Sequence, residues 1–158
     1  MYLLDTNIVS ELHRAIRRRG DARVTAWLSD VGLAACQVSA LTLMELEIGV
    51  LRMERRDARQ GAALRTWLNR KVIPEFADRV LPVDHAVALR CARLHVPDPR
   101  PERDALLAAT ALVHGLTVVT RNEADFAPTG APVFNPWRPW TVQEDTGRYV
   151  VAERHSPA

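Results

Sequence analysis

Several carboxylates of this chain stand beside strongly apolar stretches, where an unpaired charge is unfavourable. Asp5 follows an apolar strand-like run, Glu45 lies among leucines, and Asp104 opens a stretch rich in alanine and leucine. Another acid, Asp125, comes shortly after the strand-like run 117–120. Burying an unpaired carboxylate costs several kcal/mol, a large share of the stability of a domain. Such groups persist when they are paired, protonated or bound to a metal, so convergence of these segments predicts an oxygen-ligand site for Mg²⁺ or Mn²⁺.

The composition predicts a single globular domain in the cytoplasm. The 158 residues suit one hydrophobic core, and 47% apolar with 25% charged residues is typical of a folded chain. No apolar run approaches the roughly 20 residues that cross a bilayer, and the first residues lack the basic segment of a signal peptide. Cys36 and Cys91 belong to no CxxC pair, and the histidines show no ligand spacing with them. We therefore expect reduced thiols, no zinc and no membrane association.

Arginine supplies nearly all of the positive charge, and it is clustered. The net charge is only +2, with Lys71 as the sole lysine. Arginine forks suit phosphate, so the clusters are candidates for contacts with a nucleic-acid backbone. They would equally form solvated helix faces, and charge alone does not choose between the two. The candidate RNA-phosphate residues are Arg17, Arg18, Arg19, Arg52, Arg55 and Arg56.

Apolar runs of strand length alternate with longer helical patterns along the chain. Strands are predicted at residues 2–4, 33–38, 79–83, 116–120 and, more weakly, 131–134. Helices are predicted at residues 6–12, 23–31, 40–56 (with Ser39 as N-cap), 62–76, 84–95 and 102–114 (closed by Gly115). This alternation predicts an α/β fold, a three-layer α/β/α sandwich around a central, mostly parallel sheet of four or five strands. Ligands of such sheets bind beyond the carboxyl ends of the strands, where Asp5 and Thr120 would lie.

Each acid taken singly also has a structural explanation. Asp5 is suited to capping the helix that follows it, Asp104 would be favoured by the dipole of its own helix, and Asp125 fits a surface turn. Helical periodicity does not choose between Glu45 and Glu47, because each has apolar residues one turn before and after it.

Four motifs in a fixed order resemble those of a known family. They are LLDTN after the first residues, SALTxxELxxG, DALLAATA and GLTVVTRNxxDF, and a closing VFNPW is similar to one branch of the same family. The chain from Met1 to about Trp137 resembles the PIN-domain ribonucleases, most closely the VapC/FitB type, the toxin half of bacterial toxin–antitoxin pairs. We accordingly expect a PIN domain at residues 1–140 and a polar C-terminal tail at 141–158.

The resemblance assigns roles to particular residues. Asp5 matches the first acid, Glu45 the second because Gly49 follows at the expected offset, and Asp104 the third. The fourth position stays open between Asn122 and Asp125. The resemblance thus implies metal-binding and catalytic acids at Asp5, Glu45, Asp104 and Asp125. The polar residues that it implies as their support are Thr6, Asn7, Thr120 and Asn122.

The resemblance also implies an activity and partners. The expected function is that of a toxin whose Mg²⁺- or Mn²⁺-dependent endoribonuclease activity hydrolyses tRNA or rRNA. The expected partners are a cognate VapB/FitA-like antitoxin that inhibits it, a second copy in a homodimer, and DNA only through the antitoxin. An alternative is a mainly non-catalytic partner of a DNA-binding antitoxin in an autorepressor complex. The retained acids favour the enzyme, because a scaffold has no need of clustered negative charge.

Overall fold

A parallel five-stranded sheet forms the centre of the protein in the computed structural model, of which residues 1–152 are described. The strand order is β3-β2-β1-β4-β5, and every neighbouring pair is parallel. The strands are β1 (Tyr2–Leu4), β2 (Cys36–Ser39), β3 (Val80–Leu81), β4 (Thr117–Val119) and β5 (Val133–Phe134). The predicted parallel sheet is confirmed, with the first strand of the chain in the middle.

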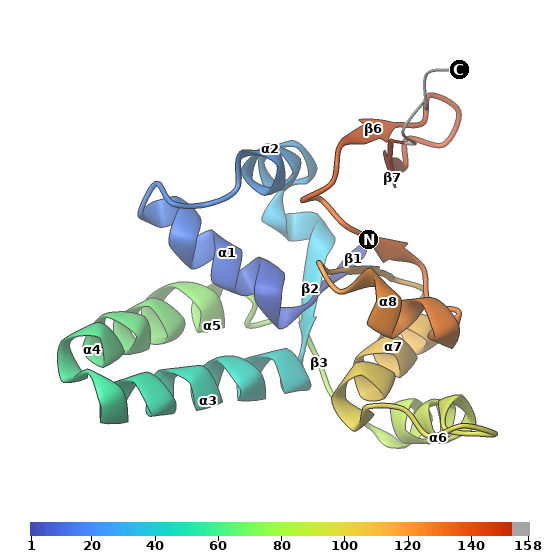
Figure 1. The fold of residues 1–158 in the computed structure, drawn as a ribbon, viewed down its shortest axis with the longest axis horizontal. Helices are drawn as coiled ribbons and strands as arrows, with labels where there is room; N and C mark the ends of the chain where they lie inside the picture. The colour runs from blue at the N-terminus through green and yellow to red at the C-terminus, as the bar shows by residue number, and fades with distance from the viewer. Residues whose placement is uncertain (153–158) are drawn as a thin grey trace.

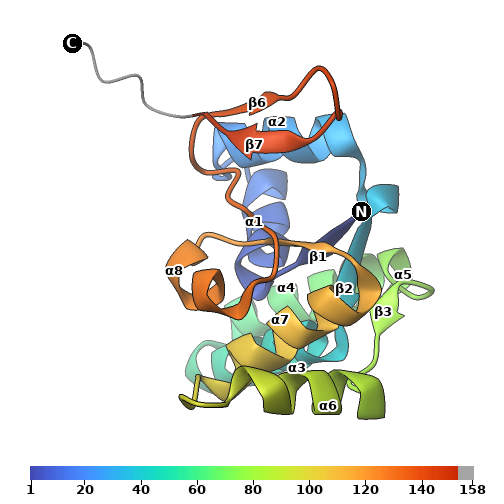
Figure 2. The same cartoon turned by 90° about the vertical axis from the view of Figure 1, so that its right-hand side faces the viewer.

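Helices cover both faces of this sheet (Figures 1 and 2). One layer contains α1 (Thr6–Ile16), α2 (Ala22–Val31), α3 (Ala40–Arg56), α4 (Ala58–Trp67) and α5 (Ile73–Glu75). The other contains α6 (His85–Leu94), α7 (Glu102–His114) and α8 (Glu123–Phe126). The three-layer α/β/α fold is therefore confirmed. Among the described residues, no helix is both long and apolar enough to span a membrane.

Alternate residues of the central strands serve different cores. Leu4 and Val119 pack in the cluster beneath α1, α2 and α3, whereas Leu3 and Val118 pack beneath α7 and α8. All four are fully buried. A sheet covered on both faces needs apolar residues at successive positions, which explains why these strands are continuously apolar in sequence. The strands also point their carboxyl ends toward one edge, where the polar residues follow.

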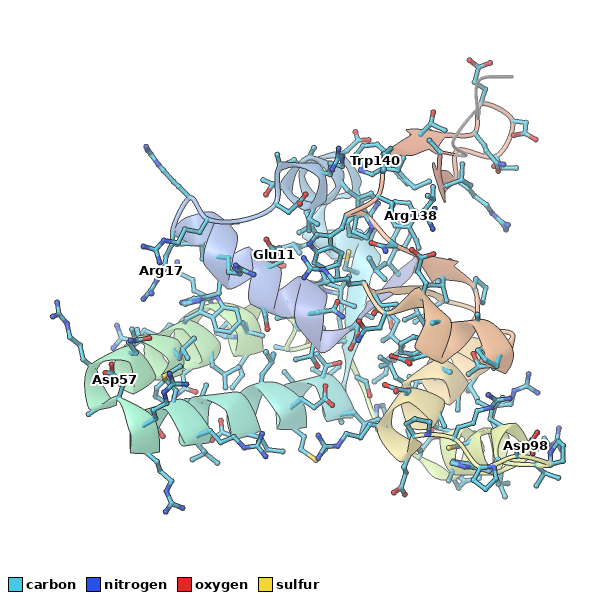
Figure 3. The ribbon with its side chains drawn as sticks, in the orientation of Figure 1. Glu11, Arg17, Asp57, Asp98, Arg138 and Trp140 are labelled. Carbon is cyan, nitrogen blue, oxygen red and sulfur yellow. The ribbon has the colours of Figure 1, made fainter. Side chains whose placement is uncertain are left out.

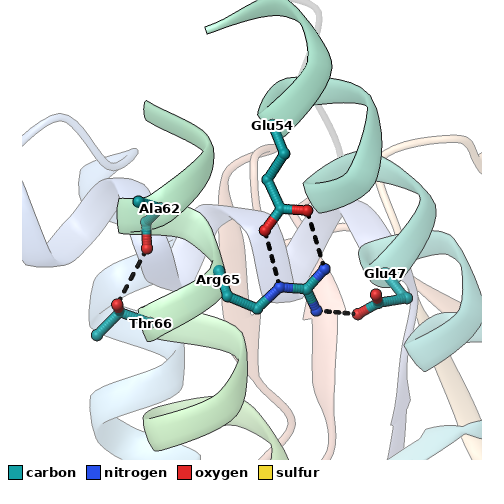
Figure 4. A network of polar contacts seen from close by, with 5 residues as sticks. All are labelled: Glu47, Glu54, Ala62, Arg65 and Thr66. Atoms are coloured by element: carbon teal, nitrogen blue, oxygen red, sulfur yellow. Dashed lines mark hydrogen bonds and ion pairs between the residues drawn. The ribbon is translucent and has the colours of Figure 1, made fainter. Parts of the chain in front are cut away.

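Helices α3 and α4 form a tightly packed hairpin. A Cβ added to Gly61 would lie 2.4 Å from Cα of Glu54, so only glycine allows this approach. Figure 4 shows Arg65 of α4 between two glutamates of α3, with its fork 3.0 and 3.2 Å from Glu54 and its Nη1 2.6 Å from Glu47. The hairpin is thus joined by backbone contact and by a bidentate ion pair.

Several element boundaries differ from those predicted. The helix predicted at 62–76 is divided, because a π-helical turn (Leu68–Val72) separates α4 from α5. The strand predicted at 33–38 begins only at Cys36, after a 3₁₀ turn, and the strand predicted at 79–83 is reduced to β3. Two cap predictions are confirmed: Ser39 accepts a hydrogen bond from Leu41 N at 3.2 Å, and Gly115 closes α7 with φ 65°.

The structure also differs from the polar tail expected at 141–158. Strand β6 (Trp140–Val142) pairs antiparallel with β7 (Tyr149–Val151) in a hairpin that lies beside α2 (Figure 2). The ring of Tyr149 packs against those of Tyr2, Trp27 and Phe134, and its hydroxyl donates to Asp30. The few aromatic and β-branched residues of this segment decide its structure despite its polar composition. Residues 153–158 lie outside the described part, and the domain boundary at 140 stays a prediction.

Candidate acidic site at the carboxyl edge of the sheet

Asp5 lies where β1 ends and α1 begins, and its carboxylate is held by three donors. Oδ1 accepts from Thr6 N at 2.7 Å, which caps α1, and Oδ2 accepts from Asn7 Nδ2 at 3.0 Å and Thr120 Oγ1 at 2.7 Å. The capping role and the site position predicted for Asp5 therefore coexist. Burial raises the pKa of Asp5 and the charge of Glu45 adds to this, while the hydrogen bonds act in the opposite direction.

Thr120 connects the ends of the two central strands. Its hydroxyl donates to Asp5 and accepts from Asn7 Nδ2 at 3.2 Å and from the backbone N of Asn122 at 3.0 Å. Oδ1 of Asn7 is buried with no hydrogen-bond partner among the described residues. An unpartnered buried oxygen beside a carboxylate is suited to a cation or to a water bound to one.

The structure separates Glu45 from Glu47. Glu45 points toward the edge of the sheet, where Oε2 accepts a hydrogen bond from the Thr6 hydroxyl and Oε1 lies 3.5 Å from Nη1 of Arg103. Glu47 instead pairs with Arg65 on the α4 side, at 2.6 Å. The choice that periodicity left open is thus made by contacts between distant segments, and it agrees with the residue that the family motif indicates.

Asp104 and Asp125 complete a group of four carboxylates, called the acidic cluster below: Asp5, Glu45, Asp104 and Asp125. Asp104 lies in the first turn of α7. Burial raises its pKa, and the charges of Asp125, Asp5 and Glu45 raise it further, in that order. The four segments therefore converge at one edge of the sheet, and their negative charges repel one another there.

Asp125 and Asn122, the two candidates for the fourth position of the site, interact with the other site residues in different ways. Asp125 is the acid whose charge acts most strongly on Asp104. Asn122 contributes its backbone N–H to Thr120, and its side chain makes no hydrogen bond to any described residue. Asp125 therefore contributes negative charge beside Asp104, and Asn122 contributes a backbone hydrogen bond; the assignment of the fourth position stays a prediction.

The donor chemistry of the cluster fits a hard divalent cation. Carboxylate oxygens, and the raised pKa values of Asp5 and Asp104, are the features that such an ion would satisfy. Within residues 1–152, however, no three Asp, Glu, His or Cys side chains are already arranged to hold a metal ion. Both oxygens of Glu45 are engaged, by Thr6 and Arg103. Metal binding here requires side-chain rotation, above all release of Glu45 from Arg103.

The predicted RNA-phosphate arginines make no ion pair with the acidic cluster. Arg17 ends the helix that Asp5 begins, which at about 1.5 Å per residue puts roughly 18 Å between them. Figure 3 shows Arg17 at the end of α1 and Asp57 at the turn between α3 and α4, both at the left of the view. All six candidates are exposed, and none forms an ion pair with a described residue. In α3, Arg52 follows Glu45 at about 10.5 Å along the helix axis, and Arg55 and Arg56 lie one turn further on.

Arg103 is the site residue that the sequence analysis missed. It is adjacent to Asp104 and its guanidinium pairs with Glu45, so a positive charge of the chain itself stands within the acidic cluster. In the sequence, only its position next to Asp104 indicated that Arg103 would lie at the site. That indication was weak because an arginine in the first turn of a helix is usually solvated.

A parallel sheet that is covered by helices on both faces and has acids at its carboxyl edge is the arrangement of a known protein family. The chain belongs to the PIN-domain family, whose family model, described as PIN domain, matches residues 2–130. The resemblance found in the sequence motifs is thereby confirmed.

Individual relatives narrow the family to toxins of the FitB and VapC type. The chain is 36% identical over 142 residues to Toxin FitB of Neisseria gonorrhoeae, covering 87% of this chain and 99% of the relative. It is 33% identical over 144 residues to VapC ribonuclease Y4jK of Sinorhizobium fredii, covering 88% and 99%. A solved structure of FitAB bound to an IR36 DNA fragment is similar with a TM-score of 0.79 and 33% identity, covering 88% and 97%.

Proposed function

We propose that the protein is the toxin of a toxin–antitoxin pair and a divalent-metal-dependent endoribonuclease that hydrolyses RNA phosphodiester bonds at the acidic cluster. The observation that carries this proposal is the convergence of Asp5, Glu45, Asp104 and Asp125 from four separate segments, with raised pKa values for Asp5 and Asp104. A fold gains no stability from such repulsion, so the cluster is suited to binding a cation.

In such a reaction the residues of the cluster would have different roles as metal ligands. Asp5 is held in one orientation by Thr6, Asn7 and Thr120, and would therefore be the fixed ligand of a bound ion. Glu45, Asp104 and Asp125 would complete the ligand set after side-chain rotation, while Asn7 holds Asp5 through its Nδ2. Bound there, Mg²⁺ or Mn²⁺ would activate a water molecule and offset the charge that develops on the phosphate.

One relative and the family model support ribonuclease chemistry. Y4jK is named a VapC ribonuclease, and its similarity extends over nearly its full length. The PIN family model covers the segments that contribute all four acids. We expect tRNA or rRNA as the substrate and the cytoplasm as the place of action. Arg17–Arg19 and Arg52–Arg56 would contact the RNA backbone at a distance from the cleaved bond.

We further propose that a VapB/FitA-like antitoxin binds and inhibits this toxin, and that the toxin forms a homodimer. The similar FitAB complex was solved bound to DNA, which supports a DNA-bound toxin–antitoxin complex, and we expect the antitoxin to make the DNA contact. If size-exclusion chromatography with light scattering finds only free monomer, with and without the cognate antitoxin, both parts of this proposal are wrong.

The second candidate function is that of a non-catalytic partner in an autorepressor complex. The DNA-bound FitAB structure favours it, and so does the ion pair between Glu45 and Arg103, which occupies the candidate site with a positive charge of the chain. The enzyme is preferred because Arg103 engages only one of the four acids, and a purely structural role does not explain the others.

Cleavage of total bacterial RNA by purified, antitoxin-free protein distinguishes the two functions. The assay has three arms: Mg²⁺ or Mn²⁺, EDTA, and an Asp5→Ala variant with metal. Discrete fragments in the first arm alone support the ribonuclease, and sequencing their ends identifies the cleaved RNA. If folded protein shown to bind metal gives no fragments in any arm, the autorepressor function is favoured instead.

A further inference from the structure

We propose that Arg121, stacked on Trp137, binds a phosphate of the RNA substrate at the rim of the acidic cluster. The inference rests on the proposed ribonuclease function, because its ligand is the RNA that this cluster would cleave. It concerns a pair of residues outside the four acids and outside the predicted RNA-phosphate arginines.

Arg121 is joined directly to the cluster through the backbone. It follows Thr120, whose hydroxyl binds Asp5, and it precedes Asn122, whose N–H returns to the same hydroxyl. The backbone of Arg121 is thereby fixed at the carboxyl end of β4, while its side chain is exposed. The side chain of Arg121 therefore starts one residue from the hydroxyl that orients Asp5.

The guanidinium of Arg121 is oriented but not neutralised. Its Cζ lies 4.5 Å from the centroid of the Trp137 ring, within the range of a cation–π contact. Stacking uses the face of the guanidinium and leaves its N–H donors, which lie in the plane, available. No hydrogen bond or ion pair to any described residue uses those donors. Such a pre-oriented fork is suited to the oxygens of a phosphate.

A single buried side chain holds the two partners together. Asn135 is 6% exposed; its Oδ1 accepts from Trp137 N at 3.1 Å and its Nδ2 donates to the carbonyl of Arg121 at 3.4 Å. Nδ2 also donates to Glu123 at 2.6 Å. Behind them, Ala152 N binds the carbonyl of Pro139 at 2.7 Å, so the C-terminal hairpin supports the segment that carries Trp137. The stack is therefore built by tertiary contacts and is not an accident of two surface side chains.

The other arginines near this edge are already engaged. Arg103 pairs with Glu45, Arg138 pairs with Glu123 at 3.1 Å, and Arg23 reaches the carbonyl of Trp137 at 3.5 Å. Figure 3 shows Arg138 close to Trp140, in the connection that leads to β6. Among these arginines, Arg121 is the one that combines a fixed orientation with unused donors.

Electrostatics explains why such a residue is needed. Four carboxylates repel the phosphates of an approaching RNA, and a cation at the rim offsets part of this repulsion. The guanidinium of Arg121 packs on Trp137, whereas that of Arg103 pairs with Glu45. Arg121 is thus assigned to substrate binding and Arg103 to the resting state of the cluster.

The test is binding of a short, fluorescein-labelled single-stranded RNA, measured by anisotropy in EDTA over a range of salt concentrations. Arg121→Ala is expected to raise the dissociation constant roughly tenfold and to reduce the salt slope by about 0.7. Arg121→Lys, which keeps the charge but not the fork, is expected to fall between. Trp137→Leu is expected to weaken binding in the same direction, and Trp137→Phe much less, since a ring remains.

The matched control is Arg93→Ala, which removes an exposed arginine in the last turn of α6 that has no ion pair with a described residue. It is expected to change the dissociation constant less than about twofold. An unchanged constant and slope for Arg121→Ala, or an equal loss for Arg93→Ala, would overturn the inference. Circular dichroism verifies folding, and the exposed Arg121 keeps the test valid if Trp137→Leu does not fold.

Metal-dependent cleavage by the same preparations separates this inference from the proposed function. If the wild type cleaves RNA and Arg121→Ala binds and cleaves it equally well, only the inference is wrong. If the wild type does not cleave RNA although Arg121→Ala binds it more weakly, the ribonuclease proposal is wrong while the phosphate-binding residue stands.

Discussion

The hydroxyl of Thr120 donates a 2.7 Å hydrogen bond to Oδ2 of Asp5, and so joins the carboxyl ends of β4 and β1. The same hydroxyl accepts hydrogen bonds from Asn7 and from the backbone of Asn122. One uncharged side chain therefore orients the best-held acid of the cluster and the loop that leads to α8. It also opposes the rise in the pKa of Asp5 that burial causes.

Replacing Thr120 tests this arrangement. Thr120→Val keeps the shape but removes the hydroxyl, so we expect metal-dependent activity to fall about tenfold and the free energy of unfolding to fall by about 1–3 kcal/mol. The pKa of Asp5 should rise further, which moves the acid limb of the pH–activity profile to higher pH. Thr120→Ser, which retains the hydroxyl, is the control. A Thr120→Val variant with an unshifted pH profile would show that the hydroxyl does not act on Asp5.

The raised pKa of Asp104 predicts a pH-dependent stability in metal-free protein. An acid with a raised pKa binds its proton more tightly in the folded state than in the unfolded chain. Asp104 therefore favours folding below its ordinary pKa of 3.8, and this contribution is lost as pH rises through the higher pKa of the folded state.

We accordingly expect Asp104→Asn to melt higher than wild type at pH 7 in EDTA, by at most about 2 °C because the group is partly exposed. The difference should diminish as the pH falls toward 3.8, where the wild-type carboxyl is becoming protonated. Differential scanning calorimetry of both proteins over this range measures it. A wild-type protein more stable than Asp104→Asn at pH 7 without metal would contradict repulsion within the cluster.

Arg103 and a divalent ion compete for Glu45 if the cluster binds metal. Arg103→Ala removes an exposed cation 3.5 Å from Glu45 Oε1, and we expect Mn²⁺ to bind more tightly, by at most about fivefold. Isothermal titration calorimetry measures the dissociation constant. Arg138→Ala is the matched control, because Arg138 is similarly exposed but pairs with Glu123, outside the cluster. Weaker Mn²⁺ binding by Arg103→Ala would assign Arg103 a supporting role instead.

The parts of the fold that depend on neighbouring residues could be predicted from sequence. The Ser39 cap, the Gly115 cap and the apolar strands each have a local cause, and the structure confirms them. The C-terminal hairpin depends on packing of Tyr149 against Trp27 and Phe134, residues from distant segments. Its polar composition therefore suggested a tail.

The candidate site shows the same limit. The motifs indicated its acids, but periodicity could not distinguish Glu45 from Glu47, since the two differ only in what distant residues offer them. Thr6 and Arg103 contact Glu45, and Arg65 contacts Glu47. The stack of Arg121 on Trp137 likewise exists only because Asn135 holds both backbones. No local pattern in the sequence expresses that relationship.

The pair of glutamates on α3 provides the most direct measurement of the central claim, that the acidic cluster is the site of RNA cleavage. Glu45→Gln and Glu47→Gln make the same chemical change two positions apart, one inside the cluster and one in the pair with Arg65. With Mg²⁺ or Mn²⁺ and total bacterial RNA, we expect Glu45→Gln to lose at least about 100-fold in cleavage rate and Glu47→Gln to remain within about threefold of wild type. Equal rates for the two folded variants would contradict the account.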